Sequence, residues 1–558
     1  MAAVMTNKKK WRGVANTGVV FILMLAGSAA LAADSWGPFA GPWERYSENP
    51  ILAGTGNKGD FDSKFVQHAC PMKIDGQWVL YYNGNQGGHP HKTYSQGVAM
   101  LANADDGESA STQMKLWKKV TLEKLSGGFA LPADLTGDGQ AELLVSLASD
   151  WSACARLVAL DLDGQVLWSH GDDSATSSPA GWLRPVVTAY DFDGDGKTEV
   201  VAEIWNDGKP RLVMLSGATG EVIRDMPSPF DNSVRQPKGY QSSRPAPLAL
   251  VAHLDGKDKP ASVIVKYEAS GSIPPLAVAY DHKLNKRWEV RGRPCSKKEK
   301  RGADMGHQAV VTDLTGDGRD DVVFGQLAVD SDGKTIFRRD LEAHADGADV
   351  FTLDGEKRVL LTLCKTGPAY CLDAKGETVW QKTKDEVSHG QAGWAGNFLP
   401  EREGLETIVQ VSGHYGIFHT FAAEDGRKLA EFQHHRGIKH PNGSRKYPDT
   451  PVKVRWRKGE DTLWVPVDRM ILDGNGEIVA ELGELDRQVV KDLRPAARKS
   501  RVAVQAVPVD LCGDDREELI LYQPYGGKAV YILTQPDSDG KPKPYQPQEN
   551  AYNRRPYL

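Results

Sequence analysis

The chain has 558 residues, of which 40% are hydrophobic and 25% are charged, and its formal net charge is −6. This length allows one large domain or several average ones, and the composition is that of an ordinary soluble globular protein. The acidic balance excludes the basic surface that nucleic-acid-binding proteins present, so we expect no nucleic-acid partner.

Residues 1–32 have the pattern of a secretory signal peptide. Basic residues between Lys8 and Arg12 precede an apolar stretch at residues 18–26, and small residues follow up to Ala32. The apolar stretch is too short to span a bilayer, and no cysteine stands directly after Ala32, where a lipid would be attached. We therefore predict a cleaved leader over residues 1–32, a secreted or periplasmic protein, and no membrane anchor.

Residues 34–110 differ from the rest of the chain because they lack the acidic repeat that dominates it. His68 and His89 flank a predicted hairpin with the sequence MKIDGQWVLYYNGN, and His91 could take the place of His89. Histidines at such positions are candidates for acid–base work, although solvated turn residues are the simpler interpretation. Asp60 and Asp62 are candidate hydrolytic carboxylates, but no second partner for a glycosidase pair is evident.

An acidic motif recurs from about residue 130 onward and leads each time into an apolar strand. Its clearest copy is YDFDGDGKTEVV, residues 190–201, in which carboxylates alternate with other residues from Asp191 to Glu199, except that Lys197 takes one of the alternate positions. The acidic positions of the four copies are Asp134, Asp138 and Glu142; Asp191, Asp193, Asp195 and Glu199; Asp313, Asp317 and Asp321; and Asp510, Asp514 and Glu518.

Carboxylates this close repel one another unless a cation lies between them. Oxygen ligands in a flexible loop favour Ca²⁺ over Mg²⁺. The loop is no EF-hand, because Ala202 occupies the twelfth position from Asp191, where a bidentate glutamate is needed. A solvated Asp/Gly turn would explain one copy, whereas four copies favour calcium; Cys512, a poor calcium ligand, makes the last copy the weakest. We predict several calcium ions with a mainly structural role.

Short strands follow each acidic loop and predict an all-β fold. A strand, a tight turn and a return strand come next, as in RLVALDLDGQVLW, and the unit recurs about every 50–60 residues without helical periodicity. This pattern predicts a β-propeller with FG-GAP-like calcium loops over residues 115–558, most simply eight-bladed, with little helix. Six cysteines are too sparse for a disulfide framework, although Cys364 and Cys371 could bridge the arms of one hairpin.

Ordered motifs from about residue 120 onward resemble the rhamnogalacturonan lyases of polysaccharide lyase family 11. The resemblance rests on VALDLDGQVLW, VVTAYDFDGDGKTEVV, GHQAVVTDLTGDGRDDVVFGQLAVDSDGK, EAHADGADV and the closing AYNRRPYL. It implies a calcium-rich eight-bladed propeller, and it makes His307, His344 and Asp346 calcium ligands or loop-orienting groups. The sequence departs from the family where His389 replaces an arginine and Leu183 replaces a histidine, and residues 34–110 replace the family's N-terminal domain.

The resemblance implies β-elimination on a uronate-containing polysaccharide. That reaction requires a neutralised carboxylate, a base for the C5 proton and an acid for the leaving oxygen. His389 is the candidate base within the propeller, and His68 with His89 is the alternative, because other propeller lyases carry a histidine pair around a similar hairpin. Trp182, Arg184 and Trp394 are candidate substrate-binding residues, although buried tryptophan is the commoner explanation for the two indoles.

We therefore expect an exported, monomeric, calcium-binding polysaccharide lyase acting on an acidic polysaccharide such as rhamnogalacturonan. A non-catalytic glycan-binding propeller is the alternative, motivated by Leu183 and His389. A propeller glycoside hydrolase is the third hypothesis.

Overall fold

The computed structural model describes residues 112–553 with gaps, the longest at 176–186, 230–247 and 494–503, and the backbone of four earlier strands. The chain divides into two compact units, residues 1–109 and 110–558. The first unit contains an antiparallel sheet in the order β1-β4-β3-β2. Its strands are β1 (Ala2–Thr6), β2 (Phe65–Ile74), β3 (Gln77–Asn85) and β4 (Ser95–Leu101). Apart from the backbone of β1, the predicted leader lies outside the described residues and stays a prediction.

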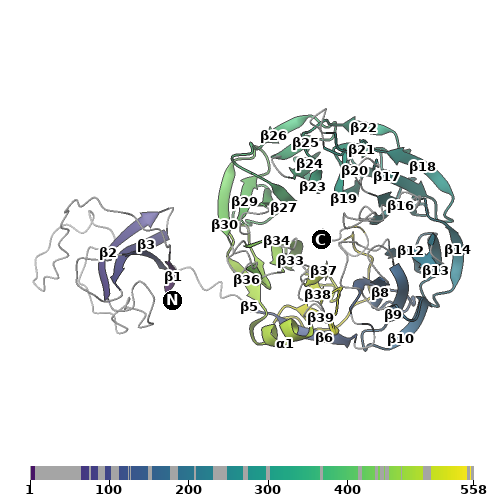
Figure 1. Cartoon of the computed structure of the whole chain (residues 1–558), viewed down its shortest axis with the longest axis horizontal. Coiled ribbons are helices and arrows are strands. Elements are labelled where there is room, and N and C mark those ends of the chain that lie inside the picture. The colour runs from purple at the N-terminus through teal and green to yellow at the C-terminus, as the bar shows by residue number, and fades with distance from the viewer. Residues whose placement is uncertain are drawn as a thin grey trace, which may run out of the picture. The chain divides into compact units, whose positions relative to one another are not determined.

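The second unit contains eight sets of four antiparallel strands, which follow one another around a ring (Figure 1). The first four sets are β7 (Phe129–Ala133), β8 (Glu142–Ala148), β9 (Cys154–Leu160) and β10 (Val166–Gly171); β11 (Val187–Tyr190), β12 (Glu199–Asn206), β13 (Lys209–Ser216) and β14 (Val222–Pro227); β15 (Leu248–Ala252), β16 (Ser262–Tyr267), β17 (Leu276–Tyr280) and β18 (Lys286–Arg291); and β19 (Met305–Thr312), β20 (Asp321–Gly325), β21 (Leu327–Val329) and β22 (Thr335–Arg338). The other four are β23 (Ala345–Leu353), β24 (Glu356–Leu363), β25 (Ala369–Asp373) and β26 (Thr378–Gln381); β27 (Gly390–Gly396), β28 (Glu406–Val411), β29 (Ile417–Ala422) and β30 (Lys428–Gln433); β33 (Val452–Arg457), β34 (Glu460–Val465), β35 (Met470–Leu472) and β36 (Ile478–Glu481); and β37 (Gln505–Val509), β38 (Glu518–Tyr522), β39 (Ala529–Thr534) and β6 (Lys115–Thr121).

Few elements lie outside these sets, so the predicted all-β fold with little helix is confirmed. The additional elements are β5 (Thr112–Gln113), which pairs with β36; the pair β31 (Ile438–Lys439) and β32 (Arg445–Lys446); the 3-10 turn η3 (Gly483–Leu485); and helix α1 (Asp486–Asp492). Among the described residues, no helix has the length and apolar character needed to cross a bilayer.

In most sets the middle strands are largely buried, whereas the last strand is largely exposed; β36 is an exception, with its two central residues buried. All residues of β16 and β38 are buried, while β14 is exposed along almost its whole length. Neighbouring sets share hydrophobic clusters, and in two of these Val145 of β8 packs with Ile520 of β38, and Val263 of β16 with Met214 of β13. Burial of one sheet face against the next is therefore what holds the ring together.

The first and last parts of the ring are joined by one strand. Strand β6 pairs antiparallel with β39, although more than 400 residues separate them, and Val120 of β6 is fully buried in the cluster beneath. Asp492 of α1 adds a polar tie, because its carboxylate accepts hydrogen bonds from Lys119 Nζ at 2.6 Å and Tyr531 Oη at 2.6 Å. The closing strand is thus held by backbone pairing, apolar burial and one ion pair.

Tryptophans of the last strands connect consecutive sets. The indole N–H of Trp168 donates to the Gly217 carbonyl oxygen at 2.6 Å, and Trp380 donates to that of Ala423 at 2.9 Å. The Trp168 ring lies against Gly220, whose φ is +71° and whose missing Cβ would lie 2.6 Å from the ring. Glycine is required in this turn both for its backbone angle and for the space that the indole occupies.

The Asp492 tie predicts a pH-dependent contribution to stability. Burial raises the pKa of Asp492, but hydrogen bonds from Lys119, Tyr531 and Gln488 outweigh it and lower the pKa to about 2. A depressed carboxyl pKa stabilises the folded state above the unfolded value of 3.8, and this contribution disappears as the pH falls through about 2. We expect Asp492→Asn to reduce stability at pH 7 by about 1 kcal/mol after solvent screening, and the difference to shrink between pH 4 and pH 2.

Calorimetric melting curves across this pH range test the prediction. Asp163→Asn is the matched control. It removes an exposed partner of Lys118, which lies on β6 next to Lys119. It should change the melting temperature little at any pH. An Asp492→Asn difference that does not change with pH would contradict the ion-pair explanation.

Candidate functional site

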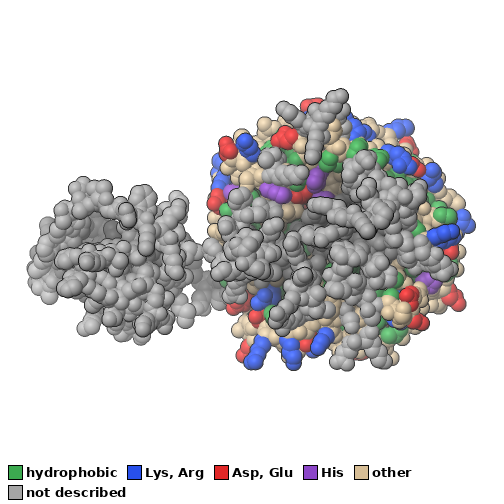
Figure 2. All heavy atoms as spheres, viewed as in Figure 1, with side chains coloured by type: hydrophobic (Ala, Val, Ile, Leu, Met, Phe, Trp, Pro, Cys, Tyr) green, Lys and Arg blue, Asp and Glu red, His purple; other side chains and the backbone are tan. Residues whose placement is uncertain are grey.

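Three histidines converge on one buried carboxylate at the first strands of three consecutive sheets. His307 lies in β19, and Asp346 is the second residue of β23. His344 immediately precedes β23, as His389 immediately precedes β27. The Nε2 atoms of His307 and His344 are 3.1 Å apart, and the two nitrogens lie 3.4 Å and 3.0 Å from Asp346 Oδ1. In Figure 1 these strands lie on the inner side of the ring, and Figure 2 shows histidine side chains gathered in the same region.

Glycines allow the backbones of these inner strands to approach closely. A Cβ on Gly306, next to His307, would lie 2.3 Å from the Ala345 carbonyl oxygen. A Cβ on Gly347, next to Asp346, would lie 2.6 Å from Thr362 Oγ1 and 2.9 Å from the Ala392 Cα. Any side chain at either position would push the strands apart and separate the histidines from Asp346.

Asp346 divides its two oxygens between two sets of partners. Its Oδ2 accepts hydrogen bonds from His389 Nε2 at 3.1 Å and from Gln391 Nε2 at 3.3 Å, while Oδ1 faces His307 and His344. The side chain is only 5% exposed. Burial raises the pKa of this carboxyl, but the hydrogen bonds from His344 and His389 outweigh it, so the pKa is lowered. Asp346 is therefore an anionic centre that organises three imidazoles.

The other ring nitrogen of His344 has its own partners. Its Nδ1 lies 3.4 Å from the Cys364 thiol. Burial lowers the pKa of His344, but interactions with Asp346, Cys295 and Cys364 raise it to about 12. Cys364 is a free thiol, as is Cys371, so the bridge considered between them is wrong. Strand register explains this, because Cys371 of β25 pairs with Leu360 rather than with Cys364.

The first two acidic loops bring their carboxylates together, as the repeat predicts. Ligand atoms of Asp134, Asp138 and Glu142 lie within 4.8 Å of one another, and so do those of Asp191, Asp193 and Glu199. Burial and the neighbouring aspartates raise the pKa of Glu199 to about 7, although the Phe192 N–H opposes them. Asp195 instead pairs with Lys197 at 3.2 Å. A buried glutamate among other carboxylates fits a hard cation.

The third and fourth loops hold an arginine where the first two have Gln140 and Lys197. Arg319 pairs with Asp317 at 2.6 Å, and Arg516 pairs with Asp514 at 2.6 Å. Among the described residues, the carboxylates of these two loops form no three-ligand group of the kind found in the first two. A calcium ion at Asp313, Asp317 and Asp321, or at Asp510, Asp514 and Glu518, stays a prediction.

The remaining predicted residues do not join the histidine cluster. Trp394 of β27 is partly buried against the hydrophobic core around Phe398, which fits a packing role. Trp182 and Arg184, with Leu183, lie outside the described residues, as do the side chains of His68 and His89, and Asp60 with Asp62. Gln391 and Cys364 contact the cluster, and the sequence analysis did not predict these contacts. No local sequence pattern indicates them.

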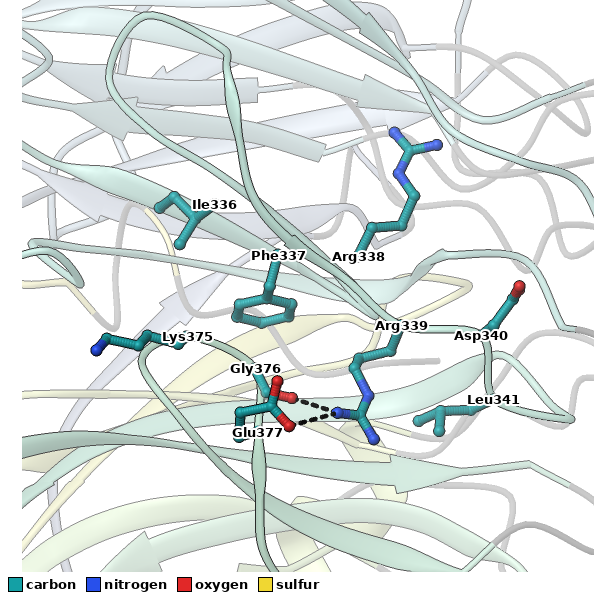
Figure 3. Close-up of a pocket in the computed structure, with 9 residues that line it drawn as sticks. All are labelled: Ile336, Phe337, Arg338, Arg339, Asp340, Leu341, Lys375, Gly376 and Glu377. Atoms are coloured by element: carbon teal, nitrogen blue, oxygen red, sulfur yellow. Dashed lines mark hydrogen bonds and ion pairs between the residues drawn. The ribbon is translucent and has the colours of Figure 1, made fainter.

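A separate cavity of about 520 Å³ lies beside the exposed strand β22 (Figure 3). Its two arginines are already engaged within the protein. Arg339 donates to the Gly376 carbonyl oxygen at 2.6 Å and lies 3.9 Å from Glu377, and Arg338 pairs with Asp304 at 3.2 Å. The histidine cluster, in which three imidazoles converge on one buried carboxylate, is the better candidate for chemistry.

Comparison with known proteins finds similarity to rhamnogalacturonan lyases. The model of the C-terminal domain of rhamnogalacturonan lyase family 11 matches residues 206–364, which include His307, His344 and Asp346. Two curated Bacillus subtilis (strain 168) proteins are similar over longer stretches. Rhamnogalacturonan endolyase YesW is 27% identical over 389 residues, which are 56% of this chain and 61% of the relative. Rhamnogalacturonan exolyase YesX is 26% identical over 309 residues, 45% of this chain and 49% of the relative.

Solved structures share the fold. A Bacillus licheniformis rhamnogalacturonan lyase of family PL11 superposes with a TM-score of 0.55 and 21% identity, covering 82% of this chain and 80% of that one. The exotype lyase YesX gives a TM-score of 0.55 at 20% identity with the same coverage. The chain spans about three-fifths of the length of YesW and half that of YesX in the sequence comparisons.

Removal of the central carboxylate tests the organisation of the cluster. We expect Asp346→Asn to reduce the free energy of unfolding by about 3–5 kcal/mol, because the three partly exposed imidazoles lose the buried carboxylate that they share. Gln391→Ala, which removes one hydrogen bond to the same oxygen, should cost only about 1 kcal/mol. Guanidinium unfolding followed by tryptophan fluorescence, with chelator present, measures both. Equal midpoints for wild type and Asp346→Asn would contradict a central role for this carboxylate.

Proposed function

We propose that this chain is a polysaccharide lyase that cleaves rhamnogalacturonan by β-elimination, on an eight-bladed β-propeller scaffold. The observation that carries the proposal is that the family-11 match includes the residues that converge at the inner strands, His307, His344 and Asp346. The names of YesW and YesX, a rhamnogalacturonan endolyase and exolyase, support the same substrate class. The eight sets of four antiparallel strands, joined by the β6–β39 pair, support the propeller.

His389 is the candidate base of this reaction. Its Nε2 donates to Asp346 Oδ2 at 3.1 Å, which leaves the Nδ1 lone pair as the proton acceptor in the neutral ring. The carboxylate stabilises the imidazolium that forms when His389 accepts the C5 proton of the uronate. An imidazole held in one tautomer by a buried carboxylate is a common arrangement for a general base.

Incubation of the full chain with rhamnogalacturonan tests the activity through the ultraviolet absorbance of the unsaturated uronate product. We expect His389→Ala to lower the rate by about 100-fold or more, because general-base catalysis contributes about 10²–10⁴-fold. His282→Ala, in the turn between β17 and β18, is the control and should retain the wild-type rate.

Three other outcomes distinguish the remaining hypotheses. If no unsaturated product forms while the polysaccharide is bound, the chain is a glycan-binding propeller. If His389→Ala is active and His68→Ala or His89→Ala is not, the base lies in the N-terminal segment. Reducing ends without ultraviolet absorbance would indicate hydrolysis.

Calcium at the acidic loops is a further part of this proposal. The Asp134–Glu142 and Asp191–Glu199 loops each bring three carboxylates together, and the buried oxygens of Glu142 and Glu199 also accept backbone N–H groups. A bound ion would neutralise their mutual repulsion, and it would stabilise the connection between the first two strands of each blade. Its role is structural.

Calcium removal tests this role. Chelation should lower the melting temperature, and calcium should restore it, because an ion at 100 times its dissociation constant stabilises by about 2.7 kcal/mol per site. Glu199→Gln should reduce the calcium-dependent rise, whereas the exposed Glu221→Gln should not. A melting temperature that chelator and calcium leave unchanged would contradict filled loops.

A further inference from the structure

We propose that the C-terminal strap, defined as residues 543–549 with Asn553, docks and releases as one cooperative unit that links the eighth, first and third sets of strands. The strap follows β39, and residues 541–548 form no helix or strand of their own. It nevertheless makes hydrogen bonds to three sets that are far apart in the sequence. The inference concerns the mechanics of the ring and does not require lyase activity.

Two amide side chains of the strap imitate a β-strand. Gln548 Oε1 accepts the Asp510 N–H at 2.8 Å, and Gln548 Nε2 donates to the Asp510 carbonyl oxygen at 2.7 Å. Asn553 holds Val251 in the same way, with its Oδ1 2.7 Å from the N–H nitrogen and its Nδ2 2.9 Å from the carbonyl oxygen. A residue pair in an antiparallel ladder exchanges the same two bonds.

These two anchors lie at the inner edges of their sets. Asp510 directly follows β37, and Val251 lies within β15. Each of these strands is the first of its set and pairs with one neighbouring strand in the sheet order of the described residues. Gln548 and Asn553 therefore satisfy backbone groups that a further strand would otherwise bind.

Tyr545 connects the strap to the first set. Its N–H donates to the Gly139 carbonyl oxygen at 2.7 Å, and its hydroxyl donates to the Pro132 carbonyl oxygen at 3.2 Å. Its ring is buried in the hydrophobic cluster that also contains Val145 and Ile520. The strap is thus anchored by apolar burial as well as by hydrogen bonds.

The sequence of the strap favours joint docking. Pro542, Pro544 and Pro547 each fix φ and lack an N–H, so the undocked segment has less conformational freedom to lose. While one anchor is bound, the next anchor stays at a high effective concentration beside its partner. Loss of one anchor therefore weakens the others, and the contacts should be made and lost together.

The strap and the histidine cluster lie at opposite ends of the ring. Gly139 and Asp510 come after β7 and β37, whereas His344 and His389 come before β23 and β27. The first strands of successive sets run in the same direction, so their beginnings and their ends form opposite faces. The Cys364 N–H, which donates to the His344 carbonyl oxygen at 3.1 Å, is therefore a reference amide remote from the strap.

Hydrogen–deuterium exchange on the full chain tests the proposal. Gln548→Ala and Asn553→Ala each remove two hydrogen bonds at one anchor, so we expect the amides of Asp510 and Val251 to exchange about 10-fold faster or more in both variants. The decisive amide is the one at the anchor that was not altered. Gln546→Ala, an exposed position in the same segment, is the matched control and should exchange like wild type.

The other outcomes would overturn the proposal. A rise confined to the altered anchor, or no rise at either, would show independent contacts. An equal rise at the Cys364 amide would show global opening instead of release of the strap. If a variant fails to fold, exchange of the wild-type chain in low guanidinium decides the question, because the Asp510 and Val251 amides should open with the same free energy and the same denaturant dependence. Unequal values would contradict a single unit.

Discussion

The antiparallel pairing of β6 with β39 is the constraint on which the ring depends. Each sheet of the second unit buries its faces against two neighbours, so an open ring would expose the apolar faces of its first and last sheets. Val145 and Ile520 show how this is avoided, because they belong to sheets at opposite ends of the chain and share one core cluster. Closure also fixes the inner strands, and through them the distances among the histidines.

The candidate site is a product of this geometry rather than of any local motif. His307, His344 and His389 are separated by 37 and 45 residues, and they meet because β19, β23 and β27 occupy equivalent positions in successive sheets. Asp346 then serves two functions through its two oxygens. One faces His307 and His344, and the other holds His389, the candidate base. A change at either side is therefore transmitted to the other through one carboxylate.

Features encoded within a few residues were predictable from the sequence, and features created by long-range packing were not. The spacing of Asp191, Asp193 and Glu199 lies within one turn, and the structure brings these groups together. His389 was identifiable only through a family resemblance, and nothing near it in sequence predicted its bond to Asp346. Strand register separated Cys364 from Cys371, although their spacing suggested a hairpin bridge. The side chains of His68 and His89 lie outside the described residues, so their predicted roles stay predictions.

The arginines of the third and fourth acidic loops give the ring an internal asymmetry. Arg319 and Arg516 are counter-ions supplied by the chain itself, so dilution cannot remove them as it would remove a bound ion from the Asp134 and Asp191 loops. If calcium occupies the first two loops, as proposed above, the strands beside them would loosen in calcium-poor surroundings, whereas the loops with Arg319 and Arg516 would keep their turns. On that proposal the four loops differ in their dependence on the ion, and exchange of backbone amides should begin beside the first two loops.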